Sequence, residues 1–352
     1  MKIVSVGDIF IKPKIFDKAI SKFDRYDISK TFFYGPDKTE EMRAYIKKME
    51  EVGFNYSSVP SEILKEIEDT DVLQVHMMPV PSVVFEVARN LKIVASNRGG
   101  TENINIEAAT ANGIPVICNP IHNANAVAEM TIGLIIAASR NICLYNVSMT
   151  RDHKWLEPSK GNSRAHELKY MVVGVIGFGT IGSLLIKKLI RGFNCNVLVT
   201  DPYVDPEAIS KLSAKLVDLD TLLSKSDFIC MMARVNEETK DMIGWREFKL
   251  MKPTSIFVNT ARPSLVDTKA LVRALQKKLI KGAAIDVFDE EPISPDNPLL
   301  YLNNVILTCH KAGDTIEAFE NSPETILHEV ERYFNKEVPN FLINPQVLSR
   351  FK

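Results

Sequence analysis

Short apolar runs recur along the second half of the chain, and segments with helical periodicity separate them. Runs that are apolar at nearly every position are typical of parallel strands covered on both faces. Strands that alternate with helices at this spacing form β–α–β units, so the pattern predicts a doubly wound α/β domain. The predicted strands are Met171–Gly177, Asn196–Asp201, Phe228–Ala233, Ser255–Ala261, Gly282–Phe288 and Asn304–His310.

The first ~120 residues carry a weaker version of this alternation, which predicts a second, smaller α/β domain. Between the two domains, Asn123–Tyr145 has helical length and few helix breakers, and an asparagine stands at its expected N-cap. We therefore predict one continuous helix that bridges the domains. The strands predicted in the smaller domain are Lys2–Val6, Lys30–Tyr34, Val72–His76, Ile93–Ser96 and Val116–Asn119.

Length and composition agree with two globular domains. A chain of 352 residues, 45% hydrophobic and 25% charged, exceeds what one hydrophobic core usually organises. No apolar run is long enough to predict a membrane span. Because 43 Lys and Arg balance 44 Asp and Glu without a basic block, we expect neither nucleic acid nor a membrane as a partner. A small-molecule partner is favoured.

The cysteines and the N-terminal segment indicate a cytoplasmic protein. Met1–Gly7 lacks the features of an export signal and instead resembles a first strand. The cysteines are odd in number and scattered without C-x-x-C spacing, so we expect neither a disulfide framework nor a zinc site. They are Cys118, Cys143, Cys195, Cys230 and Cys309.

A glycine motif lies where a strand is predicted to meet a helix. Val173–Gly182 reads V-G-V-I-G-F-G-T-I-G and contains G-x-G-x-x-G in this position. Gly177 permits a tight turn, Gly179 lets the backbone approach a pyrophosphate, and Gly182 allows close helix packing. Thr180 and Ile181 complete the expected phosphate-binding helix start. The alternative is that the glycines serve only a turn and helix packing.

The next predicted strand ends at Asp201, nineteen residues after Gly182. A carboxylate at this position can accept hydrogen bonds from the ribose hydroxyls of an adenosine. It would also repel a 2′-phosphate, and the following Pro202–Val204 contains no arginine to bind one. The sequence therefore predicts NAD as the cofactor in preference to NADP.

Polar residues follow three more of the predicted strands. Arg262, Glu291 and His310 each come soon after a buried run, and Asp286 lies within one. In an open α/β sheet the ligand binds outside the carboxyl ends of the strands. Oxidation of a 2-hydroxy acid needs a base for the hydroxyl proton, a partner for that base and a cation for the carboxylate. Histidine, glutamate and arginine meet those needs, although structural ion pairs also occupy such positions.

The other histidines have no spacing typical of metal ligands, so we expect no metal site. Only His76 among them follows a predicted strand, and it is a candidate substrate-binding residue.

These motifs together resemble those of the D-isomer-specific 2-hydroxyacid dehydrogenases, from Val72 to the C-terminal helix. Val258–Arg262, Ala284–Pro292 and Thr308–His310 are similar to the family's arginine, glutamate and histidine motifs. The resemblance implies that His310 is the acid/base, that Glu291 is its partner and that Arg262 binds the substrate. It further implies that Asp286 contacts the nicotinamide side of the cofactor and that Ala261 also binds the cofactor.

The resemblance also implies a domain organisation. We expect a Rossmann-type NAD-binding domain at 123–315 and a smaller flavodoxin-like substrate domain made of 1–122 and 316–352, with the cleft between them. Asn123–Tyr145 would help to form a homodimer. The segment Asn97–Asn103 resembles the family's glycine loop, so Gly99 and Gly100 are candidates for binding the substrate carboxylate. A tight turn without a ligand is the alternative reading of this glycine pair.

Departures from the family's pattern concern the substrate. Relatives that act on 3-phosphoglycerate carry arginines in two segments that here read His76–Pro79 and Asn123–Val127. We also expect no regulatory domain after Lys352, so phosphoglycerate dehydrogenase is the second choice. Arg98 and Lys311 could still bind a second anionic group, and the role of Arg234, where the family usually has proline, is open. Relatives that oxidise formate carry an amide at the position of Glu291, so this glutamate argues against formate as the substrate.

A reading from a different class is an NAD-sensing binding protein, like the transcriptional corepressors that share this architecture. An inactive member of the family would depart from the pattern at Arg262, Glu291 or His310, and the sequence does not. The sequence leaves open which hydroxy acid is used, the physiological direction and the oligomeric state.

Replacing His310 with alanine should abolish most turnover while NAD binding is retained, because the base is removed and the nucleotide loop is left intact. Titration with NADH and steady-state assays of the variant measure the two effects. Activity like that of the wild type would refute the assignment.

Overall fold

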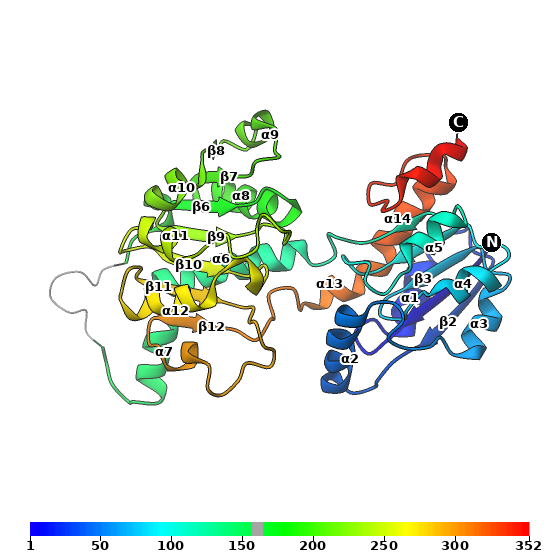
Figure 1. Ribbon diagram of the computed structural model, residues 1–352, viewed down its shortest axis with the longest axis horizontal. Helices are drawn as coiled ribbons and strands as arrows, with labels where there is room; N and C mark the ends of the chain where they lie inside the picture. The colour runs from blue at the N-terminus through cyan, green and yellow to red at the C-terminus, as the bar shows by residue number, and fades with distance from the viewer. Residues whose placement is uncertain (157–164, 352) are drawn as a thin grey trace. The chain divides into compact units, whose positions relative to one another are not determined.

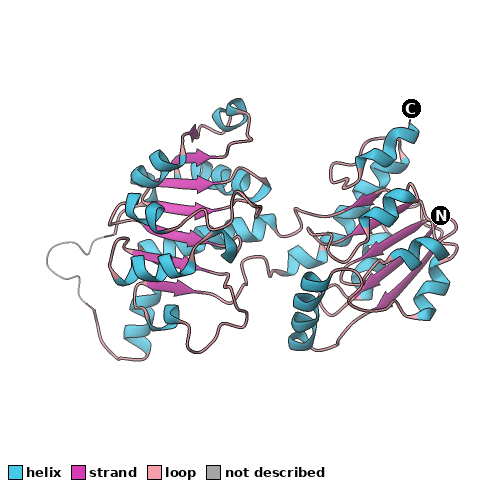
Figure 2. Cartoon of the chain, in the orientation of Figure 1, coloured by secondary structure: helices cyan, strands magenta, loops and turns pink. Residues whose placement is uncertain are grey.

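The computed structural model describes residues 1–156 and 165–351 and divides the chain into two compact units. Unit 1 comprises Met1–Asn123 and Thr315–Lys352, and unit 2 comprises Ala124–Asp314. Each unit is built around one parallel sheet with helices on both faces (Figures 1 and 2). The predicted fold class, two doubly wound α/β domains, is confirmed.

The sheet of unit 1 has five strands among the described residues, in the order β2-β1-β3-β4-β5. The chain moves outward in one direction from β1 to β2 and in the other from β3 onward, so the topological switch point lies between β1 and β3. The strands are β1 (Lys2–Gly7), β2 (Ile28–Phe33), β3 (Val72–Val75), β4 (Ile93–Ser96) and β5 (Val116–Ile117). The helices are α1 (Pro13–Ile20), α2 (Thr39–Val52), α3 (Ser61–Ile67), α4 (Ser82–Val87), α5 (Ile106–Ala111), α13 (Ile316–Glu320) and α14 (Ser322–Phe334).

The core of unit 1 combines the two ends of the chain. Side chains of α14, including Ile326 and Val330, pack in one buried cluster with Ile3 of β1 and Phe16 of α1. Burying these apolar surfaces together stabilises the unit and holds the C-terminal helix against the first strands.

The sheet of unit 2 has seven strands in the described part of the chain, in the order β12-β11-β10-β9-β6-β7-β8. Its switch point lies between β6 and β9. The strands are β6 (Val172–Ile176), β7 (Asn196–Thr200), β8 (Lys215–Leu216), β9 (Phe228–Met231), β10 (Ile256–Asn259), β11 (Gly282–Ile285) and β12 (Val305–Leu307). The helices are α6 (Ala124–Ser139), α7 (Ile142–Thr150), α8 (Thr180–Phe193), α9 (Pro206–Ser210), α10 (Leu219–Lys225), α11 (Trp245–Leu250) and α12 (Thr268–Gln276).

Most strands are shorter than their apolar runs, because burial continues past the last residue of the ladder. Val287 and Phe288 follow β11 and remain buried, although they lie outside the strand. The edge strand β8 was not predicted at all, because both of its residues are exposed and give no apolar run.

The prediction of one helix over Asn123–Tyr145 is wrong at its C-terminal end. The chain leaves α6 at Arg140, and Asn141 takes a left-handed conformation with φ 53° before α7 begins. The two helix axes differ by 64°. Asparagine tolerates the left-handed region better than most residues, so it can end a helix without interrupting the apolar pattern.

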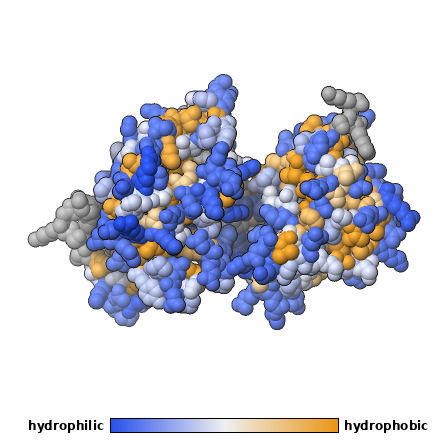
Figure 3. Space-filling model, viewed as in Figure 1, coloured by the Kyte–Doolittle hydropathy of each residue, from blue (hydrophilic) through white to orange (hydrophobic). Residues whose placement is uncertain are grey.

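The two helices differ in burial. Helix α6 lies in the core of unit 2, where Ala128 and Ile135 are fully buried, whereas α7 exposes several large apolar side chains. Among the described residues no single helix is long and apolar enough to cross a membrane, and only the bent pair of α6 and α7 has the length and composition together. The face in Figure 3 mixes hydrophilic and hydrophobic residues.

Candidate functional site

The glycine motif after β6 forms a tight turn with one open position. Gly177 has φ +101°, and a Cβ there would lie 2.7 Å from the backbone of Met232. A Cβ on Gly182 would overlap the carbonyl oxygen of Gly177. At Gly179, by contrast, no heavy atom of the described residues lies within 4 Å of a Cβ, so a ligand can approach the backbone there.

Helix α8 begins directly after this open position, with Gly179 as its N-cap and Thr180 exposed at its first turn. The first N–H groups of an α-helix have no acceptor within the helix and form its positive end. The open glycine and this helix start therefore fit the pyrophosphate of a dinucleotide, with Ile181 and Gly182 in the same first turn.

Asp201 follows β7 and contacts the same turn. Its carboxylate accepts hydrogen bonds from the backbone N–H of Phe178 (2.8 Å) and of Tyr203 (3.0 Å). Each carboxylate oxygen can accept a second bond, so the group can still take a ribose hydroxyl. The bond to Phe178, which the sequence did not predict, joins the carboxylate to the glycine turn.

His310 and Glu291 form a hydrogen-bonded pair at the other end of this sheet edge. Nδ1 of His310 lies 2.7 Å from Oε2 of Glu291, and Oε1 accepts a bond from the N–H of Phe288 (3.0 Å). Burial alone would raise the pKa of Glu291, but the bonds from His310 and Phe288 and the charge of Arg262 outweigh it, so the pKa is lowered. The carboxylate holds the ring with Nε2 left for another group.

Asp286 holds the loop that carries His310. His310 has φ 51°, and its N–H donates to the Asp286 carbonyl oxygen (2.8 Å). The Asp286 carboxylate, which is fully buried, accepts bonds from Thr308 (2.6 Å), the Lys311 N–H (2.9 Å) and the Ala312 N–H (2.9 Å). The structure does not support a nicotinamide contact for this side chain, because its oxygens are inaccessible and already bonded.

Arg262 follows β10 and is exposed. Asn259 fixes its backbone: Nδ2 donates to the Arg262 carbonyl (3.0 Å), and Oδ1 accepts from the Ala261 N–H (3.0 Å). Nη1 of Arg262 donates to the Ala261 carbonyl (2.8 Å), which leaves most of the guanidinium donors for a ligand. Because β10, β11 and β12 are neighbours in the sheet, Arg262, Glu291 and His310 follow adjacent strands.

Four residues of unit 1 were predicted to bind the substrate. Two of them, Gly99 and Gly100, are accessible to solvent, whereas Arg98 and His76 are buried. Gly99 is exposed and Gly100 half-buried, and the carboxylate of Glu102 lies against Gly100. Arg98, however, is buried and paired with Glu50 (2.7 Å) and Glu102 (3.3 Å). The binding of a second anionic group by Arg98 stays a prediction, but carboxylates of its own unit already pair with the guanidinium.

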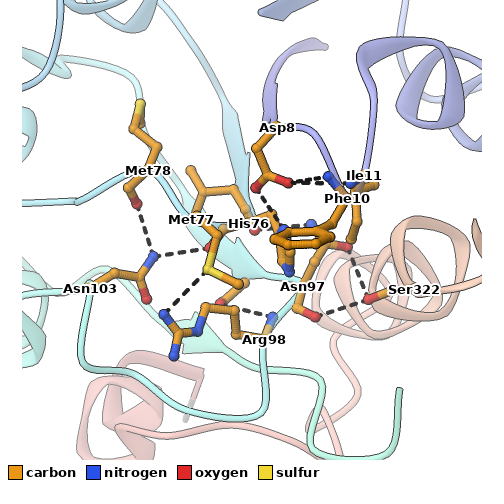
Figure 4. Close-up of polar contacts among 12 residues, drawn as sticks. Asp8, Phe10, Ile11, His76, Met77, Met78, Asn97, Arg98, Asn103 and Ser322 are labelled. Carbon is orange, nitrogen blue, oxygen red and sulfur yellow. Dashed lines mark hydrogen bonds and ion pairs between the residues drawn. The ribbon is translucent and has the colours of Figure 1, made fainter. Parts of the chain in front are cut away.

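His76 is also buried, and its Nδ1 lies 2.7 Å from Oδ2 of Asp8 (Figure 4). The sequence placed His76 after a strand but missed Asp8, although Asp8 directly follows β1 and the same rule would have found it.

Two further cations have different surroundings. Lys311 forms an ion pair with Asp314, so it too is not an unpaired charge for a substrate. The side chain of Arg234 is exposed and has no partner in the described residues. Within that part of the chain no group of His, Cys, Asp and Glu could hold a metal ion.

Comparison with known proteins identifies relatives over most of the chain. Residues 132–312 match the NAD binding domain of the D-isomer specific 2-hydroxyacid dehydrogenases. Identity to a D-3-phosphoglycerate dehydrogenase of Methanocaldococcus jannaschii is 36% over 304 residues, 85% of this chain and 57% of that protein. Identity to a glyoxylate reductase of Thermococcus gammatolerans is 37% over 298 residues, 82% of this chain and 88% of that protein.

A comparison of structures finds a similar fold in a solved member of this family. The NAD-complexed structure of a D-isomer specific 2-hydroxyacid dehydrogenase from Lactobacillus delbrueckii has a TM-score of 0.79 and 23% identity, and the match covers 98% of this chain and 100% of that one. The chain thus spans little more than half of the archaeal phosphoglycerate dehydrogenase and nearly all of the other two proteins.

The lowered pKa of Glu291 predicts how the pair contributes to stability. A carboxyl whose pKa is lower in the folded state stabilises the fold above its ordinary pKa, and the contribution is lost as the pH falls through the folded value. Replacing Glu291 with glutamine should therefore lower the Tm most above about pH 5. The difference in Tm between the wild type and the variant should narrow towards about pH 3. Thermal unfolding across this range tests it, with Glu290→Gln as the matched exposed control. A gap that does not depend on pH would contradict the assignment.

Proposed function

The chain belongs to the D-isomer-specific 2-hydroxyacid dehydrogenases, and from that membership we propose that Arg262, Glu291 and His310 are the catalytic residues of its reaction. It is an NAD-dependent oxidoreductase that transfers a hydride between the nicotinamide and C2 of a 2-hydroxy or 2-keto acid. The observation that carries the proposal is the 2.7 Å hydrogen bond between His310 and Glu291. These residues follow β12 and β11, and Arg262 follows β10, the next strand in the sheet.

The nucleotide turn of unit 2 would hold the NAD. Gly177, Gly179 and the start of α8 (Thr180 to Gly182) fit the pyrophosphate, and Asp201 fits the adenosine ribose. The bound cofactor supplies the hydride acceptor or donor. The carboxylate of Asp201 disfavours the 2′-phosphate of NADP.

His310 moves the proton that accompanies hydride transfer. In keto-acid reduction its Nε2 donates a proton to the oxygen on C2, and in hydroxy-acid oxidation it accepts the hydroxyl proton. Glu291 fixes the tautomer by bonding Nδ1 and stabilises the positive charge that the ring acquires.

Arg262 binds the carboxylate and the C2 oxygen of the substrate. Its guanidinium can form two parallel hydrogen bonds to a carboxylate, and Asn259 prevents the backbone that carries it from moving. We further propose that the backbone N–H groups of Gly99, which is exposed, and Gly100, which is half-buried, bind a substrate carboxylate.

An unphosphorylated 2-keto acid is the better substrate. Arg98 and Lys311, the cations that could have bound a phosphate, are paired with carboxylates. Phosphoglycerate oxidation remains the second candidate.

The protein acts as a cytoplasmic homodimer in this proposal. All five cysteines are unpaired, which suits a reducing compartment. Helix α7 leaves large apolar side chains in solvent, and such a patch commonly marks a subunit interface. The exposed residues are Ile142 (50%), Leu144 (51%), Val147 (41%) and Met149 (49%).

Purified protein should oxidise NADH in the presence of one or more short 2-keto acids, with saturation in both reactants, and NADPH should be a much poorer donor. The absorbance of NADH, measured against glyoxylate, pyruvate, hydroxypyruvate and 3-phosphohydroxypyruvate, tests this. Tight NADH binding without turnover on any of them would instead favour the NAD-sensing protein.

Replacing Leu144 with aspartate should convert the dimer to a monomer, because a charge on the interface must lose its hydration. Light scattering after size exclusion measures the mass. The Leu300→Asp change, at another exposed leucine of unit 2 (44% exposed), is the control and should leave the mass unchanged. A wild-type protein that runs as a monomer would exclude this arrangement.

A further inference from the structure

Arg234 is a cation of unit 2 that the proposed reaction does not use. It comes shortly after β9, the strand that adjoins β6 at the topological switch point of the sheet (Figure 1). Its side chain is exposed, and no described residue bonds or pairs with the guanidinium. The family usually has proline at this position, which carries no charge, so a role for this arginine would be particular to this chain.

The backbone that leads to Arg234 packs against the glycine turn. The N–H of Met232 donates to the carbonyl oxygen of Ile176 (2.8 Å). A Cβ on Gly177 would lie 2.7 Å from the backbone of Met232 and of Ala233. Consecutive Cα atoms are about 3.8 Å apart, so the Cα of Arg234 is at most about 7.6 Å from that of Met232. The long side chain at position 234 therefore begins beside the turn that fits the pyrophosphate.

The loop that begins at Arg234 is fixed by its own hydrogen bonds. Oγ1 of Thr239 donates to the carbonyl oxygen of Arg234 (2.7 Å). Oδ1 of Asn236 accepts hydrogen bonds from the N–H groups of Glu238 (3.0 Å) and Thr239 (2.8 Å). Because the backbone is already held, a ligand that binds the Arg234 side chain does not have to order the loop first.

The other end of this loop contacts the segment that follows β7. The hydroxyl of Tyr203 donates to Oε2 of Glu238 (2.6 Å), and the N–H of Tyr203 donates to the carboxylate of Asp201 (3.0 Å). The carboxylates of Glu238 and Asp201 therefore lie on the side where we place the adenosine ribose, whereas Arg234 lies on the side of the glycine turn. Because these carboxylates disfavour an anionic group near the ribose, the pyrophosphate is the anion that Arg234 is placed to meet.

The glycine turn carries no cationic side chain of its own. The segment Gly177–Ser183 contains neither lysine nor arginine, so the positive charge within it is that of the N-terminal end of α8. This end is equivalent to roughly half an elementary charge. Both phosphates of a dinucleotide are ionised at neutral pH, so a guanidinium beside the turn would neutralise charge that the helix end alone does not.

We propose that Arg234 binds the pyrophosphate of NAD, so that this chain holds its cofactor with a cation that the family's usual proline lacks. The guanidinium donates hydrogen bonds to phosphate oxygens and adds to the attraction of the α8 N-terminus. This inference rests on the proposed function, since it assumes that NAD lies at the glycine turn. It does not depend on the catalytic roles of Arg262, Glu291 and His310.

The first experiment measures the Kd for NADH by calorimetric titration, without turnover. Arg234→Gln and Arg234→Phe should each raise the Kd about tenfold, because both remove the charge-assisted hydrogen bonds. Arg234→Lys keeps the charge and should raise it only about threefold. Arg191→Gln is the control, since it removes an exposed arginine in the last turn of α8, about 16 Å from Thr180 along the helix. An unchanged Kd in Arg234→Gln would overturn the proposal, and so would full affinity in Arg234→Phe, which would mean that the side chain stacks on the adenine.

The second experiment assigns the effect to the phosphates. Raising the NaCl concentration from about 0.05 M to about 0.5 M should weaken NADH binding more in the wild type than in Arg234→Gln, because salt screens the attraction between guanidinium and phosphate. An equal dependence on salt in the two proteins would overturn the proposal. A loss of affinity for NADPH with none for NADH would place Arg234 at the 2′-phosphate instead and would also overturn it.

Failure of the proposed cofactor site is detected separately with Gly179→Asp. This variant places a carboxylate at the open glycine of the turn and should abolish NADH binding if the turn holds the pyrophosphate. If Gly179→Asp binds NADH as the wild type does, the proposed placement of NAD is wrong, and the assignment of Arg234 is wrong with it. If Gly179→Asp loses binding while Arg234→Gln does not, only the assignment of Arg234 is wrong.

Discussion

The carboxylate of Asp286 is fully buried and accepts hydrogen bonds from Thr308, Lys311 and Ala312, all on the loop around His310. Together with the bond from the His310 N–H to the Asp286 carbonyl, they hold the left-handed backbone of His310, a conformation that costs free energy in any residue other than glycine. The orientation of the imidazole, its bond to Glu291 and the proton transfer that we assign to it all depend on this constraint. A fully buried carboxyl group is thus retained where it holds the loop that carries His310.

Much of the fold and of the candidate site could be predicted from the sequence, because parallel strands buried on both faces leave continuous apolar runs. The rule that ligands meet the carboxyl ends of such strands then selected Arg262, Glu291 and His310. The structure places Glu291 and His310 in contact and Arg262 after β10, the strand next to β11. Gly177 and Gly182 were also predictable, since their spacing reflects close backbone packing.

Features that depend on partners distant in the chain could not be predicted in this way. Position alone could not reveal that Arg98 is neutralised by Glu50, or that Asp286 faces inwards. The break at Asn141 was hidden because the buried helix α6 and the exposed helix α7 are both rich in apolar residues. Hydrophobicity reports burial, whereas the direction of a side chain and its pairing are decided by tertiary contacts.

The packing of α14 against β1 has a consequence for the order of folding. Unit 2 is continuous in sequence, whereas the core of unit 1 needs Ile3 and Phe16 together with Ile326 and Val330. During synthesis, all of unit 2 emerges from the ribosome before the residues that complete unit 1. Contacts between such distant segments form slowly because of their loop-closure entropy. The first strands must therefore remain without their final covering helix while the nucleotide domain folds, and this nascent state is the one most exposed to aggregation and to chaperones.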